Sequence, residues 1–520
     1  MNLINKNSYS KRIFYALLIL LYIVINLAYL TRFPFVHSDE SWLGGLSRNI
    51  SYTGSFTATE PFFDLKPRYP HAIKIIFHAM QIVVIKIYGY SITNLRLLSF
   101  AFGLLSLFYF FKLVKLESKS DKLALLCTIL LAVDVQFIYA AHFARQEIIL
   151  VFVLIFSMYY FFKHLDNHRA RHSIITGIII GLSIGIHPNS FIISLPLIAL
   201  YVYYILSKKL KLRCLVQYVS VIAAFAAAFV MLSLYLDPNF ITHYSTYGNE
   251  FDIFNPILSK FANITYFYQK LFYMVSGTYY TPDIRLQFIL FPLILVISLT
   301  FYFYKRELCK NSWIIPIILS ILAINLGIIL IGRYNQTSVI FQFPLFYLLL
   351  SNIPGRLQYK FKLFFGGLLI SLLILNTVNN VLPNTSNDYD CYLNGISTAV
   401  SKNDTVLANL NSEFYFNNGR LYDYRNLAYL KENNLSFDRY IKQHGIKYVI
   451  YLEELDFIYD NEPQWDGIYG KLQYYNEMHD FLKSKCKLVH EFTNKTYGMR
   501  ITKYINSKEW KISIYKVINQ

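Results

Sequence analysis

Long apolar runs separated by short polar segments dominate the first 382 residues of the chain. Residues 13–31, 215–236 and 286–304 each approach the roughly 20 residues that a helix needs to cross a bilayer. These runs therefore predict membrane-spanning helices rather than buried helices of a soluble core. Counting every run of this kind gives twelve: 13–31, 71–90, 94–114, 122–141, 148–163, 173–187, 189–207, 215–236, 286–304, 311–331, 337–353 and 363–382.

Basic residues gather in five short segments between these runs, and short loops rich in Lys and Arg mark the cytoplasmic side of a membrane. If all twelve runs crossed and the N-terminus were cytoplasmic, the five segments would lie outside. The run 71–90 is the weakest candidate for a span because its polar residues share one helical face, so we expect it to lie in the membrane interface. The basic segments are 112–122, 163–171, 208–213, 305–310 and 356–362, and the polar face of 71–90 carries His71, Lys74, His78 and Gln81.

We therefore expect a polytopic α-helical membrane protein with about eleven spans and with amphipathic helices in a first outer loop at 32–93. Lys11 and Arg12 precede the first run, and no small-residue cleavage site follows it, so this run predicts a retained anchor with a cytoplasmic N-terminus. Residues 1–382 would form the membrane domain of a cell-membrane protein. Residues 383–520 would lie outside the cell.

After residue 382 the pattern changes to short segments that predict a small α/β domain. Residues 405–410, 447–452 and 510–518 are typical of strands, and residues 437–445 and 475–485 are typical of amphipathic helices. Cys391 and Cys486 lie in this part of the chain. They form either an extracytoplasmic disulfide or two separate buried thiols.

Composition supports a membrane protein, because only 15% of the residues are charged and 55% are hydrophobic, whereas soluble domains carry about 25% charged residues. A net charge of +18 is also typical of nucleic-acid-binding proteins. Here Lys and Arg gather in short loops, so the positive charge is explained by loops that lie on the cytoplasmic side and contact its anionic lipid. We expect membrane lipid as a partner and no nucleic acid.

Candidate chemistry gathers in the outer loops. Ser38 is expected to cap a helix whose first turn carries Asp39 and Glu40, although acidic residues are common there because the helix dipole favours them. Arg145 and Glu147 precede a later span, where a charge is costly unless it faces a cavity or a partner. The alternative is a local Arg145–Glu147 pair that only anchors the span.

Other ionisable residues lie in or beside the spans. Asp134 is inside a span, where it has either a functional role or a neighbouring backbone group or Tyr139 as its partner. Lys66 and Arg68 end the extended part of the first loop, and Arg333 occupies an outer turn. Such cations anchor lipid headgroups, and together with two carboxylates they also suit a lipid phosphate. A carboxylate can accept the proton of a hydroxyl that attacks an anomeric carbon, while Lys and Arg stabilise the departing phosphate.

The order of these features resembles the GT-C superfamily of membrane glycosyltransferases, particularly the branch with protein O-mannosyltransferases and the lipid A aminoarabinose transferase. The resemblance implies that Asp39 is the catalytic base, that Glu40 supports it and that Glu147 is the second acid. It also implies that Lys66 and Arg68 hold the carrier phosphate, with Arg145, His187, Tyr280 and Arg333 as further binding residues. The matching stretches are HSDESW (37–42), DLKPRYP (64–70), YGYSITNLRLLS (88–99), FARQE (143–147), GIHPNS (185–190) and TYYTPD (278–283).

The implied activity is inverting transfer of a sugar from a polyprenyl-phosphate donor to a protein, lipid or glycan acceptor at the outer membrane face. The alternative is a flippase, polymerase or transporter of lipid-linked saccharides, but transporters commonly place charges at the bilayer midplane between repeated halves, and no such repeat is visible. No cofactor is required by the pattern, although Mg²⁺ or Mn²⁺ would suit the oxygen ligands of Asp39 and Glu147. The C-terminal domain is expected to contact the acceptor or to shield the site.

Overall fold

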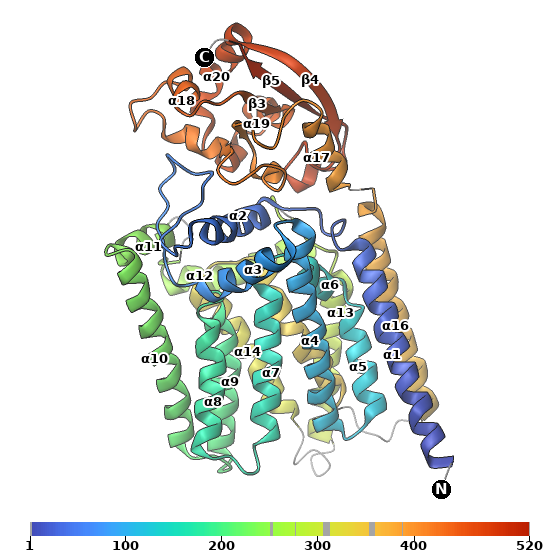
Figure 1. Ribbon diagram of the computed structural model, residues 1–520. Helices are drawn as coiled ribbons and strands as arrows, with labels where there is room; N and C mark the ends of the chain where they lie inside the picture. The colour runs from blue at the N-terminus through green and yellow to red at the C-terminus, as the bar shows by residue number, and fades with distance from the viewer. Residues whose placement is uncertain are drawn as a thin grey trace.

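The computed structural model describes residues 3–249, 253–275, 277–304, 313–352, 359–386 and 388–518. A bundle of long helices carries a smaller α/β unit at one end, and the N-terminus lies at the other end (Figure 1). The helices of the bundle are α1 (Leu3–Tyr29), α4 (Ile92–Ser118), α5 (Asp121–Ala132), α6 (Val135–His142), α7 (Glu147–Lys163), α8 (Ala170–Ser183), α9 (Ser190–Leu206), α10 (Leu212–Leu236), α13 (Arg285–Tyr304), α14 (Ile314–Ile331), α15 (Phe343–Leu350) and α16 (Tyr359–Val381).

Among the described residues, five helices are long and apolar enough to cross a membrane, or six if the bent pair α5 and α6 counts as one span. The expected eleven spans are therefore not confirmed. Several predicted spans are shorter apolar helices, such as α8 with 14 residues and α9 with 17. The chain is a multi-pass membrane protein, and its described residues contain fewer full-length spans than the hydrophobic pattern predicts.

The predicted span 122–141 is broken at Asp134, where α5 and α6 meet at 66°. The buried Asp134 carboxylate caps α6 by accepting a hydrogen bond from the Gln136 amide (2.8 Å). It also accepts bonds from the Tyr347 hydroxyl (2.6 Å) and from Nε2 of Gln287 (3.0 Å). Tyr139 is not its partner. Asp134 is therefore satisfied by backbone and by two distant side chains.

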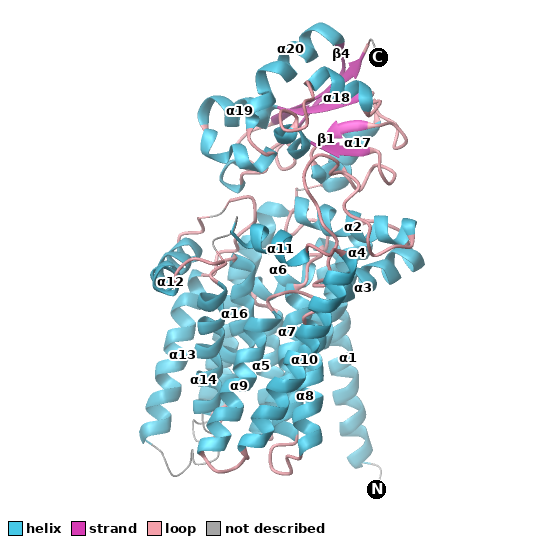
Figure 2. Cartoon of the chain, turned by 90° about the vertical axis from the view of Figure 1, so that its left-hand side faces the viewer, coloured by secondary structure: helices cyan, strands magenta, loops and turns pink. Residues whose placement is uncertain are grey.

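Several short helices lie across the end of the bundle that carries the α/β unit (Figures 1 and 2). They are α2 (Ser38–Thr53), α3 (Ile75–Tyr88), α11 (Phe240–Asn249) and α12 (Ile257–Phe272). The run 71–90 thus forms a helix that does not run along the bundle, as its polar face predicts. The basic loops after α4, α7 and α9 lie at the opposite end, with the N-terminus. The basic segments 305–310 and 356–358 lie outside the described residues.

The α/β unit contains a five-stranded mixed sheet with the strand order β2-β1-β3-β5-β4. The first three of these run parallel, whereas β5 pairs antiparallel with both β3 and β4. The strands β1, β3 and β5 and the helices α18 and α20 were predicted from sequence, and the remaining elements were not. The unit consists of α17 (Tyr389–Ser397), β1 (Val406–Ala408), β2 (Leu421–Asp423), α18 (Phe437–Gln443), β3 (Tyr448–Leu452), α19 (Glu453–Asn461), α20 (Tyr475–Lys485), β4 (Cys486–Asn494) and β5 (Trp510–Val517).

The two cysteines of the α/β unit are both free, and Cys391 is exposed rather than buried. The hydrophobic core of the unit is continuous with the first loop of the membrane part, from which Phe35, Val36, Phe62 and Phe63 are buried in the same cluster. The chain from the helical bundle therefore supplies part of the core of the α/β unit, and this fixes the unit above α2.

Candidate active site

The N-terminus of α2 is fixed by a capping box that differs from the predicted cap. Nδ1 of His37 accepts a hydrogen bond from the Asp39 amide, and the Glu40 carboxylate accepts one from the His37 amide, both at 3.0 Å. The cap is therefore His37 and not Ser38, because an imidazole nitrogen can accept this bond as a hydroxyl does. The hydroxyl of Ser38 is bonded to Arg500 of the α/β unit instead.

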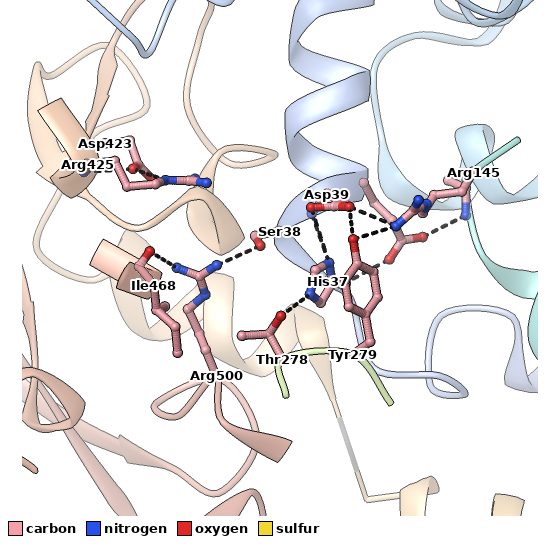
Figure 3. Close-up of polar contacts among 12 residues, drawn as sticks. His37, Ser38, Asp39, Arg145, Thr278, Tyr279, Asp423, Arg425, Ile468 and Arg500 are labelled. Atoms are coloured by element: carbon pink, nitrogen blue, oxygen red, sulfur yellow. Dashed lines mark hydrogen bonds and ion pairs between the residues drawn. The ribbon is translucent and has the colours of Figure 1, made fainter. Parts of the chain in front are cut away.

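Asp39 lies at the centre of the site (Figure 3). Its carboxylate accepts a bond from Nη1 of Arg145 at 2.8 Å and another from the Tyr279 hydroxyl. The Tyr279 hydroxyl accepts in turn from Arg145 at 2.6 Å, and the Tyr279 ring stacks on His37 with 4.2 Å between centroids. The side chain of Asp39 remains 28% exposed, whereas that of Arg145 is only 7% exposed. Asp39 is thus held in one orientation and still accessible to a ligand.

Arg145 joins Asp39 to the second predicted acid. Its Nη2 lies 3.1 Å from Oε1 of Glu147, which also accepts a bond from the Thr337 hydroxyl at 2.8 Å. The two carboxylates therefore share one guanidinium at the same end of the bundle. Arg145 and Glu147 do form the local ion pair that was one of the two alternatives from the sequence. Arg145 also binds Asp39, so the pair is part of a larger ionic network.

The charge of Arg145 dominates the electrostatics of Asp39. Burial alone would raise the pKa of the Asp39 carboxyl, but the charge of Arg145 and smaller contributions from neighbouring groups together outweigh this effect and hold the pKa well below its usual range. Burial lowers the pKa of His37 to about 3, so His37 is neutral at pH 7 and adds no positive charge there. Asp39 is therefore ionised, with Arg145 as its main counter-charge.

Further positive charges surround this carboxylate. Lys74, half-buried just before α3, has its pKa lowered to about 8 by burial and by the charges of Arg333 and Arg145. Burial and the charge of Lys74 lower the pKa of His187 well below its usual value. The charge of Arg333 also lowers the pKa of Asp39, so Lys74, Arg145 and Arg333 form one electropositive site around this carboxylate. The sequence identified Lys74 only as part of the polar face of a helix. Its position inside an apolar run was the feature that could have indicated a site residue.

Lys66 and Arg68 lie beside Trp42, one turn along α2 from Asp39. Arg68 makes two hydrogen bonds to the buried Glu60 carboxylate, at 2.8 and 3.1 Å, and its guanidinium is 4.9 Å from the centroid of the Trp42 ring. Nζ of Lys66 is 5.8 Å from the same ring. These two cations therefore lie beside a ring that Arg425 of the α/β unit also contacts, at 4.8 Å from its centroid.

Two predicted site residues lie elsewhere. Glu40 is fully buried, makes a two-bond ion pair with Arg96 (2.7 and 2.8 Å) and accepts the Ala144 amide, so it has no surface for a substrate. It positions the first turn of α2 and the loop before α7. Tyr280 points away from Asp39 and donates to Asn380 (3.1 Å), whereas its neighbour Tyr279 faces the site.

The pair Asp39 and Glu147 does not fit a bridging metal ion as it is placed here, because the Arg145 guanidinium occupies the position between the two carboxylates. Among the residues that the structure describes, no group of three or more His, Cys, Asp or Glu side chains has the arrangement of a metal site. The site instead combines one accessible carboxylate with several cations, an arrangement suited to an anionic ligand and a proton transfer.

The family model of dolichyl-phosphate-mannose-protein mannosyltransferases matches residues 71–235. No curated protein matches the sequence. Among solved structures, the chain is similar to ArnT from Cupriavidus metallidurans bound to undecaprenyl phosphate, with a TM-score of 0.51 and 13% identity over 84% of this chain and 96% of that one. It is also similar to the archaeal oligosaccharyltransferase AglB from Archaeoglobus fulgidus in complex with an inhibitory peptide and a dolichol-phosphate, with a TM-score of 0.51 and 13% identity over 88% of this chain and 72% of that one.

At this identity the structural likeness shows the fold, and the family model matches a stretch that includes α3, α4, α7 and α10. The sequence motifs, the family model and the two structures agree. The resemblance predicted from the sequence is confirmed, and the chain has the fold of the GT-C superfamily of membrane glycosyltransferases.

Proposed function

We propose that the chain transfers a sugar from a polyprenyl-phosphate donor to an acceptor hydroxyl at the outer membrane face. The observation that carries this proposal is the placement of the accessible Asp39 carboxylate among Arg145, Lys74 and Arg333. A carboxylate next to several cations can take a proton from the acceptor while the cations bind the phosphate of the donor. The lipid-carrier ligands named for the two similar structures support a donor of this class.

The proposed reaction is a single displacement. The acceptor oxygen forms a bond to the anomeric carbon as the bond between that carbon and the phosphate oxygen breaks, and Asp39 accepts the acceptor proton. Attack from the face opposite the phosphate inverts the anomeric configuration. The leaving polyprenyl phosphate gains negative charge, which Lys74 and Arg333 stabilise.

Arg145 reconciles the low pKa of Asp39 with a role as a base. A carboxylate that is strongly paired with a guanidinium is a weak base, because protonation breaks the pair. When a donor phosphate binds, Arg145 has a second anion to pair with, and its hold on Asp39 weakens. The pKa of Asp39 then rises toward a value useful for proton transfer. Glu147 keeps Arg145 in place through this exchange, since it holds the other side of the guanidinium.

The remaining site residues bind the sugar and the carrier. Nδ1 of His187 accepts the Asn189 amide (3.0 Å), so neutral His187 carries its proton on Nε2 and can donate to a ligand oxygen. Lys66 and Arg68 supply further positive charge beside Trp42. The basic loops after α4, α7 and α9 lie with the N-terminus at the far end of the bundle, and short basic loops are typical of the cytoplasmic side, so we expect the site and the α/β unit to lie outside.

The test is to incubate the purified chain with a series of radiolabelled polyprenyl-phosphate sugars and to follow release of the carrier phosphate. We expect one or a few donors to be consumed. Consumption of none of them, in the presence of protein, lipid and glycan acceptors, would overturn the proposal. Addition of EDTA should leave transfer unchanged, because a guanidinium and not a metal ion joins the two carboxylates.

A further inference from the structure

A cavity lies beside the 277–284 segment, in which Tyr279 contacts Asp39. Its volume is about 360 Å³, and it is bounded by α16, by the segment that carries Tyr280 and by Thr502, Ile505 and Asn506 of the α/β unit. Cavities that hold small ligands start at roughly 300 Å³, so this space can accommodate a ligand of the size of a sugar ring or larger. The mechanism proposed above uses none of the side chains that line it.

Carboxamides dominate the polar part of the lining. Five asparagines contribute: Asn376, Asn379, Asn380, Asn384 and Asn506. A carboxamide offers two N–H donors and an acceptor oxygen. Asn380 donates one N–H to the Asn376 carbonyl (2.8 Å), and its side-chain oxygen accepts from the Tyr280 hydroxyl and the Asp283 amide. Its second N–H is left to donate to a ligand. Within the described part of the chain, the exposed Asn379 makes no side-chain hydrogen bond. The cavity therefore presents both donors and acceptors to a ligand.

Among the described lining residues no charge is left unpaired. Asp283 is the one acidic residue among the described lining residues, and Arg285 neutralises it through two bonds of 2.9 and 2.5 Å. None of the described residues that line the cavity is Lys, Arg or His. A phosphate or another anionic headgroup would therefore lack a counter-charge, in contrast to the site around Asp39. Neutral hydroxyl groups, which both donate and accept, match this lining.

Two aromatic rings complete the cavity. Tyr280 and Phe35 both line it, and their rings contact each other edge to face, with 6.2 Å between centroids. Apolar and aromatic surface together with a few placed polar groups is typical of small-molecule sites. A sugar ring has the matching surfaces, with C–H groups on its faces and hydroxyls around its edge.

From these features we infer that the cavity is a binding site for a neutral saccharide and that the acceptor of the reaction is a glycan. The identification of the ligand as the acceptor rests on the proposed function. Tyr279 contacts Asp39 while the next residue, Tyr280, lines the cavity, and consecutive Cα atoms are only about 3.8 Å apart. The cavity and the site around Asp39 thus flank the same short segment, within the length of an oligosaccharide.

The experiment uses the full chain in detergent and neutral trisaccharides of glucose, galactose, mannose or N-acetylglucosamine as probes. Saturation-transfer NMR detects binding, and Asn379→Leu removes the amide while it keeps a similar shape on α16. The matched control is Asn394→Leu, at an exposed position of α17 that does not line the cavity. We expect at least one trisaccharide to bind, about tenfold more weakly to the Asn379→Leu variant and equally to the control.

Failure of all four probes to bind, or equal binding to the wild type and Asn379→Leu, would overturn the inference. Displacement of a bound trisaccharide by phosphatidylethanolamine would show that the cavity belongs to a lipid headgroup, and would also overturn it. Binding of undecaprenyl phosphate, measured separately, distinguishes the two proposals. If no trisaccharide binds but undecaprenyl phosphate does, only the cavity proposal is refuted. If trisaccharides bind but undecaprenyl phosphate does not, the proposed function is refuted.

Discussion

Arg500 of the α/β unit donates a hydrogen bond from Nη2 to the hydroxyl of Ser38, the first residue of α2, at a distance of 2.9 Å (Figure 3). Its Nη1 donates to the Ile468 carbonyl at 3.1 Å, so the guanidinium is anchored in the α/β unit itself. Asp39 is the next residue along α2. The α/β unit therefore holds the turn that carries the proposed base.

Ser38→Ala should lower the turnover number while carrier binding stays nearly the same. A hydrogen bond to a charged group contributes on the order of 1.5–3 kcal/mol, so we expect a loss of about tenfold as the turn moves relative to Arg145. The measurements are kcat and the affinity for undecaprenyl phosphate. Ser484→Ala, on the exposed face of α20, is the control. An unchanged kcat in Ser38→Ala would show that this contact does not position Asp39.

Asp39→Asn should abolish transfer without preventing insertion of the protein into the membrane. The amide keeps the size of the carboxylate but cannot accept the proton, and general-base catalysis contributes roughly 10²–10⁴-fold. Transfer of radiolabelled sugar and the melting temperature should both be measured. Asp390→Asn, at an exposed position in the first turn of α17, should retain full activity. Wild-type activity in Asp39→Asn would refute the assignment of the base.

Glu40→Gln should destabilise the protein rather than stop the chemistry. Loss of one partner from a buried ion pair costs about 3–5 kcal/mol, and Arg96 would be left without its counter-charge at a position with no exposure. Thermal unfolding should show a large decrease in melting temperature compared with Glu432→Gln, which changes an exposed residue. The activity per folded molecule of Glu40→Gln should stay well above that of Asp39→Asn. If Glu40 were catalytic, the two variants would lose activity to the same extent.

Binding of the carrier phosphate should weaken as the pH rises through about 8. Lys74 has a pKa of about 8 in the folded protein, compared with the usual 10.5, and only its charged form attracts the phosphate. In the absence of ligand the same shift makes the free energy of unfolding rise with pH between these two values, because the unfolded chain then binds the extra proton. Titrations with undecaprenyl phosphate below and above pH 8 test this.

Lys74→Met should bind the carrier phosphate weakly at all these pH values and show a flatter pH dependence. Lys74→Arg should bind it on both sides of pH 8, because a guanidinium stays charged. If the wild type and Lys74→Met showed the same pH dependence, the titrating group would be a different residue.

The hydrophobic pattern predicted the elements whose periodicity is strong. The polar face of 71–90 predicted a helix across the end of the bundle, and the alternating residues of β5 predicted a strand. The strand β2 was missed because its three residues include the acidic Asp423, whereas the equally short β1 consists of apolar residues only. The break at Asp134 was also missed. Asp134 caps α6 through the Gln136 amide, and its carboxylate is also held by Tyr347, which lies more than 200 residues away in the chain.

The candidate site was predicted in part. Asp39, Arg145 and Glu147 stand in motifs, and the structure brings them together. The choice between Tyr279 and Tyr280 could not be made from sequence, because neither residue lies in a helix or strand whose period would tell which side chain faces Asp39. The contribution of Arg500 was equally inaccessible, since it depends on how the α/β unit packs on the first loop.

The shared core around Phe62 has a consequence for chimeric proteins. The Phe62 carbonyl accepts bonds from the Asp423 amide (3.1 Å) and from Nδ2 of Asn426 (2.9 Å), so strand β2 ends on the first loop. A C-terminal unit exchanged between two enzymes of this fold would therefore need to bring its own partner segment from 32–93. Acceptor preference and the loop that carries the proposed base would then be inherited together, as one module formed from two distant parts of the gene.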